Sequence, residues 1–327
     1  MGRTHLQALR NIPQAEVVVV ASDDPVALSG DLTGAAGNLG TAGERFDFSG
    51  MRRYTDWSEA VRDPEIEAVD LCLPTHLHAP AALAALEAGK HVLVEKPMAL
   101  DGEQADRMIE AARRAGRVLM TAHVLRFFPP YLPLAELVRS GRLGAWRMAV
   151  FRRRCAAPTW GAWLSDPAKS GGGVFDLLIH DVDFCLHLFG PPRAVSAAGH
   201  EDLARGIDLI SAQCHYDGGA VVITGGWHHP AAYPFSMEYT VSFDGGTVDY
   251  SSEGRPPKLY TDSGQAEELP LAAQDGYQAE IEYFLECAAA GRQPERCPPE
   301  ESAAAVKLMR LLAEARKRPG ALVEWRL

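Results

Sequence analysis

The sequence predicts an α/β protein: a parallel sheet flanked by helices, followed by an α+β domain with a large, mainly antiparallel sheet. Short apolar runs alternate with helix-like segments in the first third, and longer alternating runs with hairpin turns follow. The chain has 327 residues, of which 47% are hydrophobic, so it is long enough to bury two cores. We place the domains at 1–125 and 126–327.

The first third contains repeated strand and helix units. The apolar run 17–20 ends in a polar cluster at Ser22, and the run 68–73 ends at Pro74. An Ala-rich helix at 79–88 stops at Gly89, a strand covers 91–94, a helix covers 102–115 and a fourth strand covers 117–122. Units of this kind require a parallel sheet with right-handed crossovers.

From about residue 146 the pattern becomes antiparallel. Strand-like runs cover 146–153, 208–216, 220–227, 237–243 and 247–250, and the turns at 217–219 and 244–246 predict hairpins. Helices are expected at 174–188, 277–290 and 300–316, with a last short strand at 321–325. The Gly- and Ala-rich segment 30–43 is expected to be a mobile loop.

The beginning of the chain lacks the opening of a Rossmann-type domain, which has a strand, a G-x-G-x-x-G turn and a helix that binds pyrophosphate. Here a helical run starts almost at once, so that Gly2 occupies the position of the third glycine, and the first, central strand is missing. We therefore expect Met1 to be an internal methionine of a longer protein, which the intact mass of the natively expressed protein would test. A short N-terminal helix of another fold is the alternative.

Composition excludes several classes of function. A net charge of -11 and a pI near 5.5 give no surface suited to nucleic acid. Six cysteines without C-x-x-C spacing favour free thiols rather than disulfides or a metal site. No apolar run is long enough for a membrane span and no signal peptide is recognised, so we expect a cytoplasmic protein.

The strand at 91–94 runs into Glu95 and Lys96, and the phrase "EAGKHVLVEKPMAL" resembles the signature of the glucose-fructose oxidoreductase and inositol dehydrogenase family (GFO/IDH/MocA). The carboxyl end of a parallel strand is where open α/β sheets bind ligands. The resemblance implies that Lys96 lies beside a nicotinamide and a substrate hydroxyl. A surface lysine at a strand end is the alternative interpretation.

A second motif, "DPAKSGGGVFDLLIHDVDF", lies in the other predicted domain and also resembles the family. Glycines 171–173 would let a loop approach a ligand before a helix begins, and Asp176 and His180 are four residues apart on one face of that helix. A carboxylate beside an imidazole fixes its tautomer and raises its basicity. Taken alone, the pair would be a solvated helix face, but two motifs in the expected order argue against that.

The resemblance implies hydride transfer between a nicotinamide and a hydroxyl or keto carbon of a sugar or polyol. As the hydride leaves carbon, the hydroxyl loses a proton, and the negative charge on oxygen needs a nearby cation. We assign His180 as general base, Asp176 as its orienting partner and Lys96 as the charge stabiliser.

The resemblance also implies contacts to the cofactor, NADP or NAD. A serine, Ser22, stands where an acidic residue usually binds the ribose, which leaves room for a 2′-phosphate that Arg3 would neutralise; a shift of one position would instead favour NAD through Asp23. For Thr75 and His78, a helix cap and a solvent-facing residue are the alternatives. The implied cofactor contacts are Gly2, Ser22, Pro74, Thr75, His78, Glu95 and Lys96.

Substrate contacts are expected from His123 and Arg126, after the last strand of the first domain, and from Trp163 with Trp160 before the glycines. An arginine and indole rings suit a polyhydroxylated ring, although they equally suit core packing. Two other functions stay open: redox-assisted glycoside cleavage with a retained nicotinamide, and a catalytically silent sensor of nicotinamide or sugar. The family resemblance further implies a homodimer or homotetramer formed through the second-domain sheet.

Overall fold

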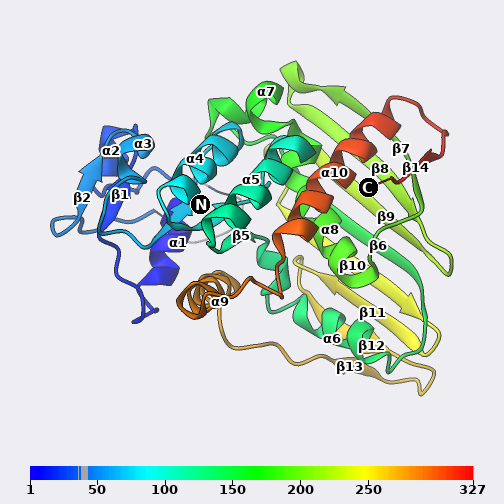
Figure 1. The fold of residues 1–327 in the computed structure, drawn as a ribbon. Helices are drawn as coiled ribbons and strands as arrows, with labels where there is room; N and C mark the ends of the chain where they lie inside the picture. Colours follow the sequence, from blue (N-terminus) through cyan, green and yellow to red (C-terminus); the bar gives the residue numbers. More distant parts are fainter. Residues whose placement is uncertain (36, 38–42, 327) are drawn as a thin grey trace. The chain divides into compact units, whose positions relative to one another are not determined.

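The computed structural model describes residues 1–35, 37 and 43–326, and its contacts divide the chain into two units. The first unit comprises Met1–His123 with Asp275–Ser302, and the second comprises Val124–Gln274 with Ala303–Leu327. Each is described by itself below, with the element labels of Figure 1.

The first unit is built from parallel strands and helices. Its elements are α1 (Gly2–Leu9), β1 (Val19–Ala21), α2 (Pro25–Leu28), β2 (Arg52–Tyr54), α3 (Trp57–Ala60), β3 (Ala68–Leu71), α4 (Thr75–Glu87), β4 (His91–Glu95), α5 (Gly102–Ala115), β5 (Leu119–Ala122) and α9 (Gly276–Ala290). Strand β1 pairs with β2, and β4 pairs with both β3 and β5, all in parallel. The predicted parallel strands are therefore confirmed.

In the described part of this unit the strands form two separate sheets, β1–β2 and β3–β4–β5. No described strand pairs with both sheets. Part of the predicted loop at 30–43 lies outside the described residues; within the rest, Asp31 makes an isolated bridge to Arg45.

Local signals explain where the helices of this unit begin and end. Asp101 caps α5, because its Oδ1 accepts the N–H of Gln104 at 2.8 Å, and Gly116 ends the helix with φ +62°. Gly89, with φ +76°, follows α4 in the same way. The sequence alone placed α9 in the second domain, whereas its contacts are with α1 and β4 of the first unit.

The second unit is built around a nine-stranded sheet in the order β13-β12-β11-β10-β6-β9-β8-β7-β14. Within the described residues of this sheet, β6 and β9 pair in parallel, and all other neighbouring strands pair antiparallel. Both predicted hairpins are present, as β8–β9 and β10–β11. Its elements are η1 (Val124–Arg126), α6 (Leu132–Ser140), β6 (Trp146–Ala156), η2 (Ala162–Ser165), α7 (Pro167–Ser170), α8 (Gly173–Phe189), β7 (Ala194–Asp202), η3 (Leu203–Arg205), β8 (Ile207–His215), β9 (Ala220–His229), β10 (Ser236–Phe243), β11 (Gly246–Ser251), β12 (Arg255–Tyr260), β13 (Ala266–Glu268), most of α10 (Pro299–Arg316) and β14 (Val323–Glu324).

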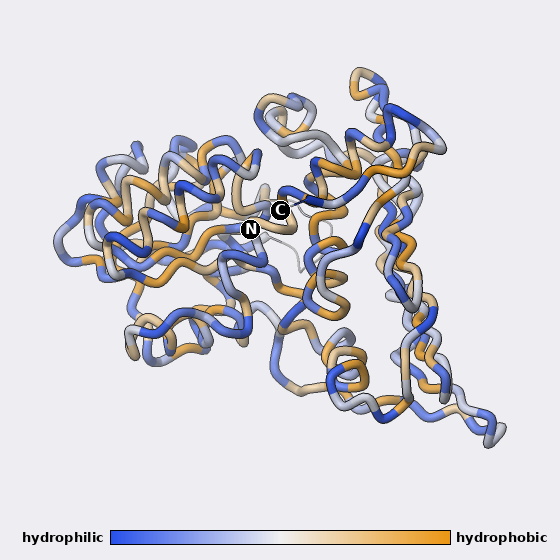
Figure 2. Tube along the Cα trace, turned by 45° about the vertical axis from the view of Figure 1, so that its right-hand side comes forward, coloured by the Kyte–Doolittle hydropathy of each residue, from blue (hydrophilic) through white to orange (hydrophobic). Residues whose placement is uncertain are grey.

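Helix α8 packs on one face of this sheet, against β6, β8 and β9 (Figure 1). The strands alternate accordingly between hydrophobic and hydrophilic residues along the trace (Figure 2). On β6, for example, Phe151 and Cys155 are buried, whereas Met148 on the opposite face is 40% exposed. The alternation thus gives the sheet one buried face and one face with accessible side chains.

A search of the described helices for a segment long and apolar enough to cross a membrane finds none.

Candidate active site

Lys96 follows directly on β4, at the carboxyl end of the middle strand of the three-stranded sheet. Its backbone N–H donates to Oε2 of Glu95 at 3.0 Å, and the Glu95 side chain is buried. Burial alone would raise the pKa of Glu95, but contact with His5 and the charge of Lys96 lower it to about 2. The turn that carries Lys96 is therefore held by an ionised carboxylate.

The turn from β3 into α4 carries three of the predicted cofactor residues. Pro74 is the N-cap of α4, and Thr75 and His78 are both 1% exposed. The His78 ring nitrogens lie 2.7 Å from two backbone carbonyl oxygens, those of Leu73 and Pro97. As placed, the His78 ring ties this turn to the segment after Lys96, which argues for a positioning role over direct contact with a cofactor.

Gly2 is the first residue of α1, and Ser22 directly follows β1. A Cβ added at Gly2 would lie 3.7 Å from Cβ of Cys72, so the protein itself leaves ordinary space there. Ser22 Oγ accepts the N–H of Asp24 at 3.2 Å, while Asp23 is exposed. Arg3, the residue considered for a 2′-phosphate, donates from Nη1 to the carbonyl oxygen of Ala35 at 2.8 Å.

Two helix N-termini of the first unit are suited to an anionic ligand. The N-caps of α1 and α4 are Met1 and Pro74, neither of which makes a side-chain cap hydrogen bond. By contrast, aspartates cap α2, α3 and α5: Asp24, Asp56 and Asp101. Uncapped backbone N–H groups and the helix dipole favour phosphate groups, so the residues present fit the pyrophosphate of a dinucleotide.

Asp176 and His180 lie on α8 of the second unit. From Gly173 to Leu186 every residue of this helix is buried except these two, which are half-buried. The predicted i, i+4 spacing therefore coincides with the accessible stripe of an otherwise buried helix.

The start of α8 is fixed by groups that the sequence analysis missed. Asp208 on β8 is completely buried, and its Oδ2 accepts the N–H of Val174 at 2.9 Å. The same carboxylate pairs with Arg316 on α10. No local sequence signal indicates this cap, because Asp208 lies 34 residues after Val174, with β7 between α8 and β8.

The glycines before α8 are needed for packing within the protein. Gly171 and Gly172 have φ +83° and +98°, which L side chains rarely adopt. A Cβ at Gly173 would lie 2.5 Å from the indole of Trp227. The close approach expected toward a ligand is thus made to the protein's own side chains.

The predicted substrate residues lie in different surroundings. Arg126 is buried and forms a bidentate pair with Asp183, with Nε–Oδ2 and Nη2–Oδ1 distances of 2.9 Å and 2.7 Å. This placement argues against contact between Arg126 and a substrate, because the guanidinium is buried and its Nε and Nη2 both donate to the Asp183 carboxylate. His123 is 1% exposed at the end of the first unit, and Trp163 is half-buried in η2.

The predicted residues thus fall into two groups. The first unit holds Lys96, Glu95 and the turns expected to bind the cofactor, and the second holds Asp176, His180, Arg126 and Trp163. Within the first unit the structure also brings His5 to Glu95, a contact that sequence spacing gave no reason to expect.

Comparison with known proteins agrees with this arrangement. Residues 1–123 match the oxidoreductase family with an NAD-binding Rossmann fold, and residues 131–249 match the GFO/IDH/MocA C-terminal domain. Among curated relatives, D-glucoside 3-dehydrogenase of Escherichia coli K12 is 37% identical over 136 residues (41% of this chain, 39% of the relative). The 1,5-anhydro-D-fructose reductase of Ensifer adhaerens is 40% identical over 134 residues, or 40% of each chain.

These alignments span about two fifths of the relatives' own length. The fold extends further: a levoglucosan dehydrogenase in complex with NADH and levoglucosan superposes with a TM-score of 0.81 at 20% identity, covering 99% of this chain and 96% of that one. With a Rossmann domain, a large mixed sheet and both domain matches in order, the chain belongs to the GFO/IDH/MocA family of NAD-binding oxidoreductases.

Proposed function

We propose that this protein is a dehydrogenase that transfers a hydride between a nicotinamide cofactor and a hydroxyl or keto carbon of a sugar or polyol. The observation that carries the proposal is the exposure pattern of α8. Between Gly173 and Leu186 only Asp176 and His180 are accessible, and every other residue is buried. Burying a helix on nearly all sides while keeping one acid–base pair accessible suits proton transfer to or from a ligand. The sugar and glycoside relatives support the substrate class.

In this proposal His180 accepts the proton of the substrate hydroxyl and Asp176 holds its ring in the required tautomer. The Lys96 ammonium stabilises negative charge as it develops on the substrate oxygen. The bound nicotinamide supplies or accepts the hydride. We propose that Gly2, Ser22, Pro74, Thr75 and Lys96 contact the cofactor, with the backbone N–H groups at the starts of α1 and α4 binding the phosphates. His78 and Glu95 hold the turns that carry these residues.

Between the two cofactors we propose NAD. Asp23 presents an exposed carboxylate directly after the second strand of the predicted fold, where it would accept a ribose hydroxyl and repel a 2′-phosphate. Arg3 is already bonded to Ala35. Fluorescence titration with NADH and NADPH tests this choice, and tighter binding of NADPH would contradict it.

The catalytic assignment is tested with Lys96→Ala and His180→Asn in an assay of sugar and polyol oxidation. Each loss of an acid–base or charge-stabilising group is expected to lower kcat by about 10²–10⁴-fold. Binding of NADH, measured separately, should persist. His200→Asn, at an exposed position on β7, is the matched control. Unchanged turnover in both Lys96 and His180 variants would remove these roles.

We further propose a cytoplasmic homodimer or homotetramer that associates through the accessible face of β6 and β10 in the nine-stranded sheet, at least three strands away from β7. All six cysteines are free thiols, as a reducing compartment favours. That sheet face carries Arg152 and Arg154, both paired with Glu238. Sedimentation of wild type against a Val150→Glu variant, at a half-buried position of the same face, tests the association.

A further inference from the structure

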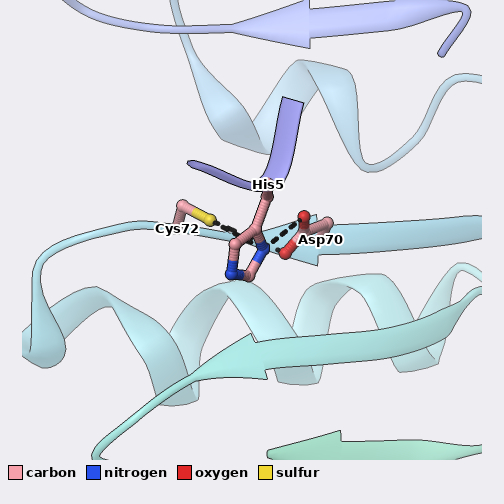
Figure 3. A group of neighbouring side chains, drawn as sticks. All are labelled: His5, Asp70 and Cys72. Atoms are coloured by element: carbon pink, nitrogen blue, oxygen red, sulfur yellow. Dashed lines mark hydrogen bonds and ion pairs between the residues drawn. The ribbon is translucent and has the colours of Figure 1, made fainter. Parts of the chain in front are cut away.

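A buried imidazole, His5, lies between two carboxylates in the first unit, Asp70 and Glu95. Figure 3 shows the ring with Asp70 and Cys72. His5 on α1 is 1% exposed, and its Nδ1 forms a hydrogen bond of 2.8 Å with Oδ2 of Asp70 on β3. Its Nε2 lies 3.0 Å from Oε1 of Glu95 at the end of β4, an ion-pair contact rather than a well-aligned hydrogen bond. One ring therefore connects a helix to two neighbouring strands.

The two partners require the ring to be a cation. Ionised carboxylates only accept hydrogen bonds, and a neutral imidazole donates from one nitrogen, whereas an imidazolium donates from both. Burial lowers the pKa of His5, but the charge of Asp70 and contacts with Asp70 and Cys72 outweigh this effect and hold that pKa well above its ordinary value. A protonated ring thus satisfies both carboxylates at neutral pH.

The other titratable groups around the ring do not compete for this charge. Burial raises the pKa of the Cys72 thiol, whose Sγ lies 3.5 Å from Nδ1, to about 11. From α9, Tyr277 packs its ring with the centroid 6.3 Å from that of His5, and burial raises its pKa. Burial also raises the pKa of Glu280 well above its ordinary value, which favours the neutral form of this carboxyl. Contact with His5 and the charge of Lys96 lower the pKa of Glu95.

The contact reaches the turn that carries Lys96. Oε1 of Glu95 faces His5, while Oε2 accepts the backbone N–H of Lys96 at 3.0 Å. A carboxylate held at both oxygens has one orientation, and loss of either contact frees it to rotate.

We propose that His5, as a buried imidazolium between Asp70 and Glu95, is a positioning residue that orients Glu95 and thereby fixes the backbone at Lys96. This role rests on the proposed function only in that Lys96 is assigned to charge stabilisation; the charge state of the ring is independent of it.

A bound metal ion is the alternative account, since ligand atoms of His5, Asp70 and Cys72 lie within 4.8 Å of one another. Two ligands of a tetrahedral zinc ion, each about 2.0–2.1 Å from the metal, lie about 3.3 Å apart. The distance of 2.8 Å between Nδ1 and Oδ2 is that of a shared proton. We therefore interpret the contact between His5 and Asp70 as a hydrogen bond, and binding of a metal ion is an outcome of the test.

The first test is the ¹⁵N spectrum of the histidine rings in the wild-type protein. We expect both ring nitrogens of His5 to carry protons at pH 7.5, above the ordinary histidine pKa of about 6.5. The exposed His200 ring gives a reference signal. A neutral His5 ring at this pH overturns the proposal. So does one zinc ion per chain in elemental analysis that is absent from a Cys72→Ala variant.

The second test compares two variants that each keep one of the contacts. An amide nitrogen in His5→Gln replaces Nε2 and keeps the donor toward Glu95, whereas His5→Asn replaces Nδ1 and keeps only the donor toward Asp70. We expect His5→Asn to lower kcat by about 10–100-fold with NADH binding retained, as misplacement of a catalytic group does, and His5→Gln to recover most of that loss.

The pH profile separates positioning from a general loss of structure. The general base His180 sets the acidic limb of kcat/KM in the wild type. Without the cation the pKa of Glu95 rises, so protonation of Glu95 should add to this limb and steepen it in His5→Asn, while His200→Asn leaves the limb unchanged. Equal losses in both His5 variants with an unchanged limb overturn the positioning role. If the wild type oxidises no sugar or polyol, the proposed function fails, and the ring spectrum still decides the charge of His5.

Discussion

Gly173 at the start of α8 offers a sharp test of how this helix is held. A Cβ at this position would lie 2.5 Å from Cε3 and 2.6 Å from Cδ2 of Trp227, and 3.1 Å from Cβ of Asp208. Ordinary contacts of a Cβ begin at 3.4 Å, so the overlap is near an ångström against a rigid indole whose residue is 3% exposed. Overpacking of this size costs about 1–3 kcal/mol.

Urea unfolding, followed by circular dichroism, should show this loss for Gly173→Ala. The matched control is Gly218→Ala, where no atom lies within 4 Å of the added Cβ and φ is not positive. Because the clash is with the indole, Trp227→Leu in the Gly173→Ala background should cost less than Trp227→Leu alone. Equal stability of Gly173→Ala and Gly218→Ala would refute the reasoning.

Three further outcomes are expected. Asp183→Asn leaves the completely buried Arg126 guanidinium facing a neutral amide and should destabilise the protein by about 3–5 kcal/mol in urea unfolding; no loss would contradict the buried pair. The folded-state pKa of Glu280 is raised, so the folded protein binds an extra proton above the unfolded pKa and loses stability as pH rises. Glu280→Gln should therefore be more stable than wild type at pH 7, and a loss there would contradict a neutral Glu280. Glu95 has the opposite sign: its pKa falls from 4.5 to about 2, so its contribution is present above pH 4.5 and disappears as pH falls toward 2. Glu95→Gln should flatten thermal stability over that range, and an unchanged slope would count against the ion pair with His5.

Periodicity and turn residues were sufficient to predict most of the strands, both hairpins and the helix that carries Asp176 and His180. Strands β2, β7, β12 and β13 were missed. These features depend on residues close in sequence, such as the four-residue spacing on α8. Which polar residues of that helix are accessible could not be predicted in the same way, because Asp181 and Asp183 are also polar and are buried.

Long-range pairs could not be predicted in this way. Arg126 was interpreted as a substrate residue from its place after a strand, but its partner Asp183 lies in a different helix and pairs with the Nε–Nη2 edge of its guanidinium. The glycine run was interpreted as a ligand approach, while its real neighbour, Trp227, comes from a distant strand. The role of His5 likewise could not be predicted, because its partners Asp70 and Glu95 lie on β3 and β4, far from α1 in the sequence.

The parallel pair at the centre of the second-unit sheet has a consequence for how the chain folds. Met148 on β6 pairs with Ala220 on β9. The segment between them, which contains α8, β7 and β8, must therefore form a large loop before the two central strands can pair. Hairpins such as β8–β9 form from neighbours in sequence, whereas this closure costs loop entropy first. Refolding of this unit should accordingly be limited by this one long-range pairing, and a flexible insertion in the turn between α8 and β7 should slow it further.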